Sequence, residues 1–494
     1  MNPVYFPAIG ALCVLGFDLL ARPKISGEGS PRATALAGIR MGSISLISLV
    51  SVLISLRSMG RLSPGGLLSI DAFGAFSMGF VAIAAAIVLA LALTHFGMAR
   101  SRPAEPLALL LFSASGMLAA SVTEHLLVLL VALELAWLPI MALIAIDSRR
   151  LSSSESSLKA FFAHAFASVV FAQGVVFLFG ATGGLGFDAL AIANSGRPLV
   201  FEIGVALILV GLIARSVIAP FHPWSPDVHE GAPSFVTAYL GTALQATSFF
   251  VLLRILHAVA APEIVPSTSL IARIPTLFAI LACTGLLWGH AMALVQVGLR
   301  RMVGWLGVGQ VGFLTLALVD ARGPGGEALL LALIASTVSV AGVLATLSSL
   351  SHHERACEQV GDLAGMMETS PIRATLLALF LLSLGGFPGT VGFVARFEIL
   401  ASIESSGHEW HRYLLLFGLI STILALAAVG RPLLAMLHPQ DSHREPSRAL
   451  TNEQVVLALC GFSVLYFGIA PLLGEQVLFG WVEESISKAL SSLR

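Results

Sequence analysis

The stretch Leu126-Leu-Val-Leu-Leu-Val-Ala-Leu-Glu-Leu-Ala-Trp-Leu-Pro-Ile140 is apolar throughout, apart from one carboxylic acid, Glu134. Stretches of this kind recur along the chain, of which 57% is hydrophobic and 11% charged. Ordinary soluble domains have ~45–50% apolar and ~25% charged residues. A helix that crosses the hydrocarbon core of a bilayer needs ~20 mostly apolar residues. The sequence therefore predicts an all-α integral membrane protein.

About fourteen apolar runs are long enough to be interpreted as membrane-spanning helices. They cover residues 3–20, 41–56, 72–98, 107–122, 126–146, 158–181, 200–219, 234–256, 274–297, 302–319, 328–350, 374–403, 413–437 and 455–473. The first run lacks a basic n-region and a small-residue cleavage site, so we expect a helix and no signal peptide. The loops are too short for a soluble domain, which predicts a single membrane domain over residues 1–494.

Charge and cysteine patterns exclude several classes of function. The net charge of −1 comes without the clustered basic residues of a nucleic-acid-binding surface. The four cysteines form no Cys-x-x-Cys pair, so neither a zinc site nor a cysteine-ligated iron–sulfur cluster is supported. No Gly-x-Gly-x-x-Gly motif follows a strand pattern. We therefore expect no cofactor in this chain and assign any redox chemistry to partner subunits.

Arginine and lysine are distributed unevenly between the two sets of loops. Loops after odd-numbered runs carry them at positions 22, 24, 32, 100, 102, 149, 150, 300, 301, 355, 444 and 448, and the opposite loops carry fewer. Cytoplasmic loops are enriched in these residues. We expect a multi-pass protein of the bacterial cytoplasmic (inner) membrane, with both termini outside.

Two of the runs are interrupted. In the seventh, Arg215-Ser-Val-Ile-Ala-Pro220 continues into Phe221-His-Pro-Trp-Ser-Pro226, and in the twelfth the interruption is Gly385-Gly-Phe-Pro-Gly-Thr390. Broken helices in corresponding halves are typical of ion sites in inverted-repeat transporters. An ordinary kink is the alternative for each single proline, because such prolines are tolerated in membrane helices.

Glu134 and Lys159 are candidate proton carriers, because an ionisable group in a membrane helix costs at least ~2.5–3.5 kcal/mol on insertion scales. Glu134 has no opposite charge in its own run. It therefore binds a proton or meets a cation from another helix, with a structural hydrogen bond as the alternative. Lys159 opens the sixth run and either snorkels to the interface or, if buried, can lose its proton as arginine cannot.

Four more polar residues extend this set across the chain. Arg215 lies at the seventh break, Arg396 follows the twelfth break, and Gln245 and Gln310 lie in the eighth and tenth runs. The alternative for Arg396 is an interfacial position, and for the glutamines it is simple hydrogen bonding between helices. The whole set indicates a polar line that crosses many helices.

The histidines allow several interpretations. His222 and His229 flank the seventh break, where histidine can relay protons near neutral pH. His164 and His290 lie inside apolar runs, where a satisfied polar side chain is as good an interpretation as a relay. The neighbours His352-His353-Glu354 lack the i, i+4 spacing of a helical metal site and are interpreted as a solvated loop.

The seventh break also carries a family signature. Phe221-His-Pro-Trp-Ser-Pro-Asp-Val-His-Glu-Gly-Ala-Pro-Ser234 resembles the F-H-x-W-x-P-D-V-Y-x-G-A-P motif of the N subunit (NuoN type) of respiratory complex I. Glu134-Leu-Ala-Trp-Leu-Pro139 resembles that family's E-L-x-S-L-P, and Glu155-Ser-Ser-Leu-Lys159 resembles its E-A-x-x-K. Further anchors at 300–305 and 383–397 follow in the family's order, so the resemblance covers residues from about 120 to 400.

This resemblance implies an antiporter-like fold of fourteen helices, with two inverted five-helix repeats at about residues 105–437 and breaks in helices seven and twelve. It also implies a central polar axis in which the helix-five glutamate, here Glu134, pairs with the helix-seven cation, here Arg215. We therefore expect the two side chains within ~6 Å, the range in which opposite charges strongly affect each other's ionisation. Lys159 corresponds to the family's helix-six lysine.

The chain departs from the family at the other positions of the axis. Arg215 and Arg396 replace lysines, Gln245 replaces another lysine, and Gln310 replaces a histidine. Arginine stays charged and glutamine does not titrate, so these side chains do not carry protons themselves. Proton hopping would then fall to Glu134, Lys159, His222 and water.

The leading hypothesis is a proton-translocating subunit of an NADH:quinone oxidoreductase, in the lipid bilayer beside other complex I membrane subunits. NADH, FMN, iron–sulfur clusters and quinone are expected in partner subunits. The alternatives are a subunit of a Mrp-type cation/proton antiporter or of an energy-converting hydrogenase, and a structural subunit with a degenerate proton path. The signature at residues 221–234 favours the N subunit.

Overall fold

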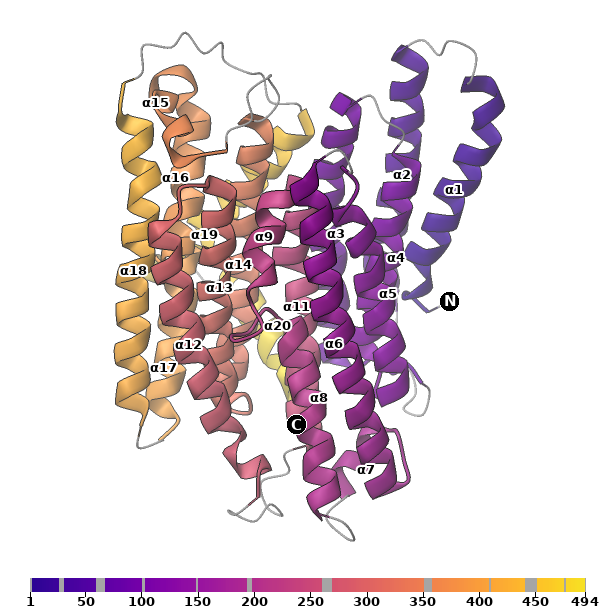
Figure 1. Ribbon diagram of the computed structural model, residues 1–494, viewed down its shortest axis with the longest axis vertical. Coiled ribbons are helices and arrows are strands. Elements are labelled where there is room, and N and C mark those ends of the chain that lie inside the picture. The colour runs from indigo at the N-terminus through magenta and orange to yellow at the C-terminus, as the bar shows by residue number, and fades with distance from the viewer. Residues whose placement is uncertain are drawn as a thin grey trace.

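The computed structural model describes residues 2–25, 31–58, 67–99, 103–147, 150–192, 198–259, 269–350, 358–407, 410–439, 451–474 and 477–493. These residues form a bundle of long helices (Figure 1), with no strands beyond three isolated β-bridges. Twelve of the described helices are long and apolar enough to cross a bilayer, and Tyr5–Leu20 and Pro371–Gly385 are shorter apolar helices. The all-α membrane fold is confirmed. The count of fourteen requires both shorter helices and stays a prediction.

The first half of the chain contains the first broken helix. Its elements are α1 (Tyr5–Ile25), α2 (Pro31–Ser58), α3 (Ala72–Ala99), α4 (Ala104–Val122), α5 (Leu126–Ile144), α6 (Leu151–Thr182), α7 (Phe187–Ile192), α8 (Pro198–Arg215), α9 (Trp224–Gly231), α10 (Ser234–Tyr239), η1 (Leu240–Leu244) and α11 (Gln245–Val259). Helices α10, η1 and α11 are continuous, and η1 is a π-helical turn within them.

The second half contains the second broken helix. Its elements are η2 (Ile271–Arg273), α12 (Ile274–Val295), α13 (Leu299–Ala317), η3 (Leu318–Asp320), α14 (Pro324–Leu350), η4 (Val360–Leu363), α15 (Met366–Thr369), α16 (Pro371–Gly385), α17 (Val391–Ser405), α18 (His411–Leu437), α19 (Thr451–Leu473) and α20 (Val477–Ser491). Figure 1 shows α1 and α2 at one edge of the bundle and α18 at the opposite edge.

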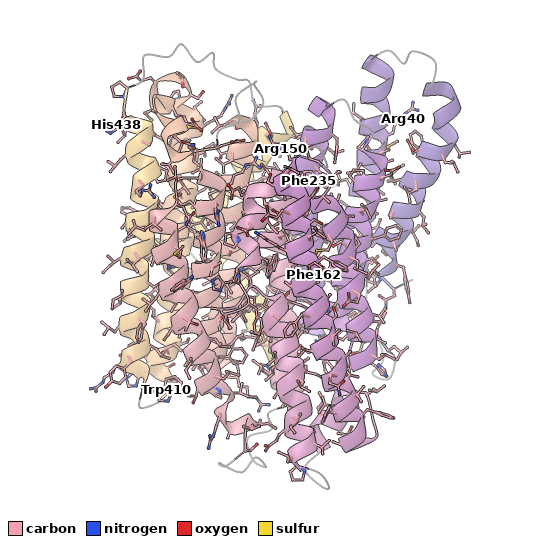
Figure 2. All side chains as sticks on the ribbon, viewed as in Figure 1. Arg40, Arg150, Phe162, Phe235, Trp410 and His438 are labelled. Atoms are coloured by element: carbon pink, nitrogen blue, oxygen red, sulfur yellow. The ribbon has the colours of Figure 1, made fainter. Side chains whose placement is uncertain are left out.

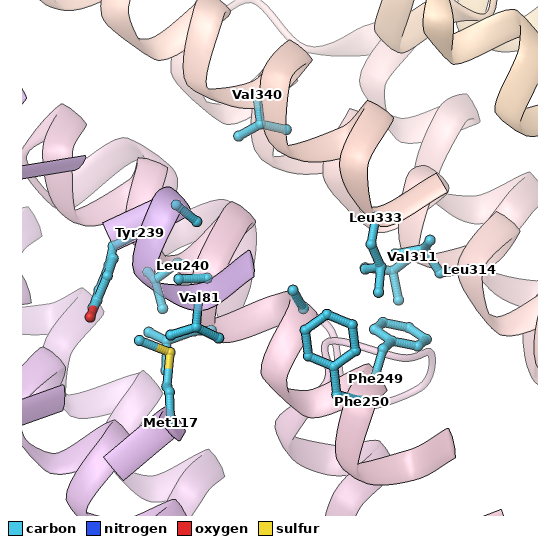
Figure 3. Packing of buried hydrophobic residues seen from close by; sticks show 14 of the residues in the cluster. Val81, Met117, Tyr239, Leu240, Phe249, Phe250, Val311, Leu314, Leu333 and Val340 are labelled. Carbon is cyan, nitrogen blue, oxygen red and sulfur yellow. The ribbon is translucent and has the colours of Figure 1, made fainter. Parts of the chain in front are cut away.

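The core of the bundle lies where the two halves meet. The span formed by α10, η1 and α11 is almost completely buried, as are α13 and α14, whereas α2, α6 and α18 are mostly exposed on the outside. Figure 3 shows Phe249 and Phe250 of α11 close to Leu314 of α13 and Leu333 of α14. Helices that are apolar all round belong in such a core, because no side of them meets water.

The two ends of the bundle can be compared with the predicted topology. Helix α18 runs from Trp410 at one end to His438 at the other, and Arg150 before α6 lies at the same end as His438 (Figure 2). The loops after the fifth and thirteenth runs therefore share one side, as the sequence predicts. Which side faces the cytoplasm stays a prediction.

Both predicted helix breaks are present. Helix α8 ends at Arg215 and α9 begins at Trp224, and between them Val217 has a positive φ of 61° and the Ala219–Pro220 peptide bond is cis. Helix α16 ends at Gly385 and α17 begins at Val391. The residue after α16, Gly386, has a φ of 79°, a left-handed conformation that ends helices and that glycine adopts without strain.

Candidate proton-conducting site

Glu134 of α5 and Arg215 of α8 form an ion pair between their helices. Arg215 Nη2 lies 2.5 Å from Glu134 Oε1, so the predicted pairing is confirmed. The Arg215 side chain is 1% exposed and that of Glu134 is 32% exposed, so the guanidinium is the more deeply buried partner. Arg215 is also the last residue of α8, where the negative end of the helix dipole favours a cation.

Ser168 of α6 completes this pair. Its hydroxyl donates to Glu134 Oε1 at 2.5 Å and accepts a hydrogen bond from Arg215 Nη2 at 2.6 Å. One hydroxyl thus links the carboxylate and the guanidinium, which limits the positions that either group can adopt. Hydrogen bonds to charged groups are the strong ones in proteins. No sequence pattern marks Ser168 as part of this site.

An aromatic wall lies beside the ion pair. The His164 ring packs between Trp137 of α5, with ring centroids 3.8 Å apart, and Trp224 of α9, at 4.8 Å. His164 Nδ1 lies 2.8 Å from the Ala160 carbonyl oxygen, which fixes Nδ1 as the protonated nitrogen of a neutral ring. The other nitrogen, Nε2, has no hydrogen-bond partner among the described residues. His164 is therefore half satisfied, with one ring nitrogen left without a partner.

A small cavity of about 30 Å³ separates the first break from the middle of the bundle. Its polar lining includes Arg215, Gln245 and Ser336, and its apolar wall includes Val311 and Val340. About 10–15 Å³ of such volume is enough for one water molecule, so the cavity has room for one or two. The structure thus brings Arg215 and Gln245, predicted to share the polar line, to the lining of one cavity.

The second break is arranged differently around Arg396. This side chain is 3% exposed, so it lies inside the bundle and not on its surface. Its guanidinium donates to the carbonyl oxygens of Gly385 at 2.8 Å and Leu384 at 2.5 Å, at the end of α16. It also lies 4.5 Å from the centre of the Phe313 ring. Within the described part of the chain Arg396 has no carboxylate partner, and the negative end of a half-helix takes that place.

Gln310 of α13 and His290 of α12 are two further buried polar residues of the second half. Gln310 is buried on α13 next to Val311, which lines the cavity. His290 of α12 is fully buried, and its Nδ1 lies 2.7 Å from Ser421 Oγ of α18. Its Nε2 has no partner among the described residues. That these two residues continue the polar line through the second half stays a prediction.

The family of the chain follows from comparison with known proteins. Residues 123–425, more than half of the chain, match the family described as NADH:quinone oxidoreductase/Mrp antiporter, TM. NADH-quinone oxidoreductase subunit N 2 from Koribacter versatilis (strain Ellin345) is 30% identical over 446 residues, which are 87% of this chain and 88% of that protein. The chain belongs to the N-subunit family of NADH-quinone oxidoreductases. The resemblance stated from the motifs is confirmed.

Two solved structures share the fold of this N-subunit family member. A chain of respiratory complex I from Thermus thermophilus with bound aureothin has a TM-score of 0.75 at 24% identity, covering 96% of this chain and 99% of that chain. A chain of the membrane-bound sulfane sulfur reductase (MBS), an archaeal respiratory membrane complex, has a TM-score of 0.83 at 19% identity, covering 100% and 99%. Likeness at these identities shows the antiporter-like fold alone.

Lys159, which corresponds to the family's helix-six lysine, is partly exposed in this chain, as the snorkelling alternative expects, and its role as a proton carrier stays a prediction. The Lys159 side chain is 44% exposed, and its Nζ lies 2.7 Å from both Glu155 and Asp227. Asp227 also lies 3.2 Å from Arg301 of α13. The lysine is thus held by two carboxylates, one from its own helix and one from α9. The sequence analysis quoted Asp227 within the family signature but gave it no partner.

His222 lies in the break itself, as the sequence predicts. It is buried, and its ring centroid lies 5.4 Å from that of Trp305 of α13. Its Nδ1 has no hydrogen-bond partner among the described residues. His229, one helix later, is also buried, and its Nδ1 lies 2.9 Å from the Ser225 carbonyl oxygen.

A second charged cluster lies away from this site and was missed by the sequence analysis. Arg254 of α11 is buried and lies 2.6 Å from Asp71 and 3.2 Å from Glu124. Asp71 precedes α3 and Glu124 lies between α4 and α5, so the cluster joins α11 to the start of α3 and to the connection between α4 and α5. No local sequence pattern connects residues so far apart in the chain.

Possible metal ligands and thiols can be located in the described part of the chain. Within them, no group of three or more His, Cys, Asp and Glu side chains is arranged to hold a metal ion. Cys13, Cys283 and Cys460 are free thiols. The histidines of His352-His353-Glu354, interpreted as a solvated loop, lie outside the described residues.

Proposed function

We propose that the chain is the proton-translocating N subunit of a bacterial NADH:quinone oxidoreductase in the cytoplasmic membrane. The observation that carries this proposal is the cluster of Glu134, Ser168 and Arg215, of which Arg215 lines the same cavity as Gln245. Other complex I membrane subunits lie beside the chain. NADH, FMN, the iron–sulfur clusters and quinone bind to partner subunits of the complex. Quinone reduction in those partners drives proton movement here.

Glu134 takes up and releases the proton in this mechanism. When its carboxylate is ionised, it neutralises Arg215, and when it binds a proton that neutralisation is lost. Arg215 stays protonated throughout, so it alternates between a paired and an unpaired state. Breaking a buried ion pair costs about 3–5 kcal/mol. A charge that approaches from a neighbouring subunit can therefore decide when Glu134 binds its proton.

The remaining site residues support this step in different ways. Gln245 holds water in the cavity through its amide but does not carry the charge. Gln310 and Arg396 extend the line into the second half, where Arg396 acts as a fixed positive charge that sets the local field. Lys159 holds Asp227 and so positions α9, which carries part of the cavity wall. His222, with one unpartnered nitrogen, relays protons at the break.

A structural subunit with a degenerate proton path is the second candidate. The observation that favours it is Arg396, whose Nη1 and Nη2 donate to backbone carbonyl oxygens and whose guanidinium does not titrate. On that account the ion pairs hold the helices together and no proton crosses the chain. A Mrp-type antiporter or an energy-converting hydrogenase remains the alternative assembly, since the matching family includes Mrp antiporters.

The decisive experiment measures protons pumped per quinone reduced in vesicles that carry the assembled complex. Glu134→Gln should remove most of the pumping contributed by this subunit while NADH:quinone activity and assembly persist. The matched control is Glu105→Gln, the same change at an exposed position in the first turn of α4. Normal pumping in Glu134→Gln would favour the structural candidate. Copurification with antiporter or hydrogenase subunits, instead of complex I subunits, would overturn the proposed assembly.

A further inference from the structure

The hydroxyl of Ser336 on α14 does not bond its own helix as neighbouring hydroxyls do. Ser339 Oγ, three residues later, donates to the Ala335 carbonyl oxygen at 2.8 Å, which is the usual arrangement in a membrane helix. Thr346 does the same with Gly342. Ser336 is only 3% exposed, yet its Oγ has no hydrogen-bond partner among the described residues. Water in an adjacent cavity is the partner that such a buried hydroxyl normally uses.

Ser336 lines the same cavity as Arg215, Trp224 and Gln245. Each of those three residues has side-chain N–H groups without a partner in the described part of the chain. Guanidinium, indole and amide N–H groups only donate, whereas a hydroxyl donates and accepts. A water molecule that accepts from the guanidinium places its own hydrogens on acceptors, and Ser336 Oγ provides one. The cavity of about 30 Å³ has room for one or two such molecules.

The cavity lies on another side of Arg215 from the ion pair. Arg215 Nη2 contacts Glu134 and Ser168, and neither of those residues lines the cavity. Water there hydrates the guanidinium without contacting the carboxylate. Its hydrogen bond contributes most when Glu134 is protonated, because the charge of Arg215 is then not neutralised. Water in the cavity therefore favours the protonated state of Glu134.

The other charged groups around the pair come from several helices. His164 of α6 interacts electrostatically with Arg215, and His229 of α9 lines the cavity. Helix α4, which packs against α5, has its acidic residue, Glu105, in its exposed first turn. Arg254 of α11 is held by two carboxylates in a separate cluster. Helices α13 and α14 contribute no charged side chain to the cavity wall.

We propose that Ser336 is a positioning residue for the proton step at Glu134 and acts through a water molecule that it holds against Arg215. The inference rests on the proposed function of Glu134. The water accepts a hydrogen bond from Arg215 on the cavity side and donates one to Ser336 Oγ. It hydrates the guanidinium while Glu134 carries a proton. Ser336 thus sets how readily that proton binds, although no hydrogen bond joins it to either charged group.

The test is an infrared pH titration of the purified assembled complex, in which the carbonyl stretch of protonated Glu134 is assigned by its absence in Glu134→Gln. Ser336→Ala should lower the pH at which half of Glu134 is protonated by about one unit, because a hydrogen bond to a charged group changes an equilibrium about tenfold. The control is Ser349→Ala, the same change on α14 outside the cavity, which should titrate like wild type. An equal pH of half-protonation in wild type and Ser336→Ala would overturn the positioning role.

A second measurement locates the water directly. A high-resolution electron cryo-microscopy map of the wild-type complex should show a water molecule within hydrogen-bond distance of both Ser336 and Arg215. Ser336→Val, which replaces the hydroxyl with methyl groups, should show none. A wild-type map without this water would overturn the proposal, whatever the titration gives.

The positioning role and the proposed function fail in different experiments. Normal pumping in Glu134→Gln would overturn the proton step at Glu134 and leave the water between Ser336 and Arg215 in place. An unchanged titration in Ser336→Ala would remove Ser336 from the step and leave Glu134 as the proton carrier.

Discussion

The two broken helices carry the same residue type but compensate its charge in opposite ways. At the first break Arg215 faces an ionisable carboxylate, Glu134, at 2.5 Å. At the second, Arg396 faces the backbone carbonyl oxygens of Leu384 and Gly385. A carboxylate can take up a proton and release its partner, whereas a carbonyl oxygen cannot. The comparison indicates that only the first break can switch and that the second holds a constant charge.

The largest expected effect is the loss of the carboxylate at the first break. Glu134→Leu leaves Arg215 buried without a counterion and should destabilise the subunit by about 3–5 kcal/mol. Thr422→Val, which removes the 3.3 Å contact to Arg396, should cost no more than about 1 kcal/mol. Thermal unfolding of the purified complex compares the two variants. Equal unfolding temperatures for Glu134→Leu and Thr422→Val would contradict the different charge compensation at the two breaks.

A smaller effect is expected when the fixed charge at the second break is kept but its geometry is changed. Arg396→Lys retains the positive charge and can donate to one or both carbonyl oxygens, so pumping should persist with a loss of about 1–2 kcal/mol in stability. Arg396→Gln removes the charge and should reduce pumping. Protons pumped per quinone reduced are measured for both variants. Equal loss in both would mean that the shape of the guanidinium, and not its charge, is required.

Ser168 provides the next test, since it occurs at the first break only. Ser168→Ala removes one hydroxyl bonded to two charged groups, which should cost about 1.5–3 kcal/mol and slow proton transfer. Ser168→Thr keeps the hydroxyl and should restore the rate. The measurement is the pH profile of pumping in both variants. If the pH profile of pumping in Ser168→Ala equals that of wild type, the hydroxyl takes no part in proton transfer.

The smallest effect is expected at Lys159. Exposed ion pairs contribute about 0–1 kcal/mol, so Lys159→Ala should change stability little and leave pumping in place. A relay lysine, as expected from the sequence, predicts abolished pumping instead. The same vesicle assay decides between them, with Lys488→Ala as a control for the loss of one positive charge. Abolished pumping in Lys159→Ala alone would return the lysine to the proton path.

Several features could be predicted from sequence because their causes are local. Apolar runs of membrane length define the helices, and proline and glycine mark both breaks. The pairing of Glu134 with Arg215 also follows from the family resemblance, and the structure places the two side chains in contact. In each of these cases the information lies in a short segment or in a strong motif.

Other features depend on packing and could not be predicted. A serine in a membrane helix usually bonds its own backbone, as Ser168 also does to the His164 carbonyl oxygen, so nothing distinguished it in advance. The sixth run was expected to begin at residue 158, but α6 begins at Leu151. Its first two turns are rich in serine, and they are helical although their residues are too polar to be read as part of an apolar run. The position of Lys159 relative to the surface therefore depended on contacts with α9.

The π-helical turn η1 has a consequence for how the chain can change over evolutionary time. Its five residues, Leu240–Leu244, complete a turn that an α-helix would make with about one residue fewer. Removing one residue there would rotate the preceding part of the helix relative to Gln245 by about 100°. A single-codon deletion could thus turn the amide away from the cavity in one step. Length variation at this turn, and not only substitution, is a route by which relatives could gain or lose a polar group at the axis.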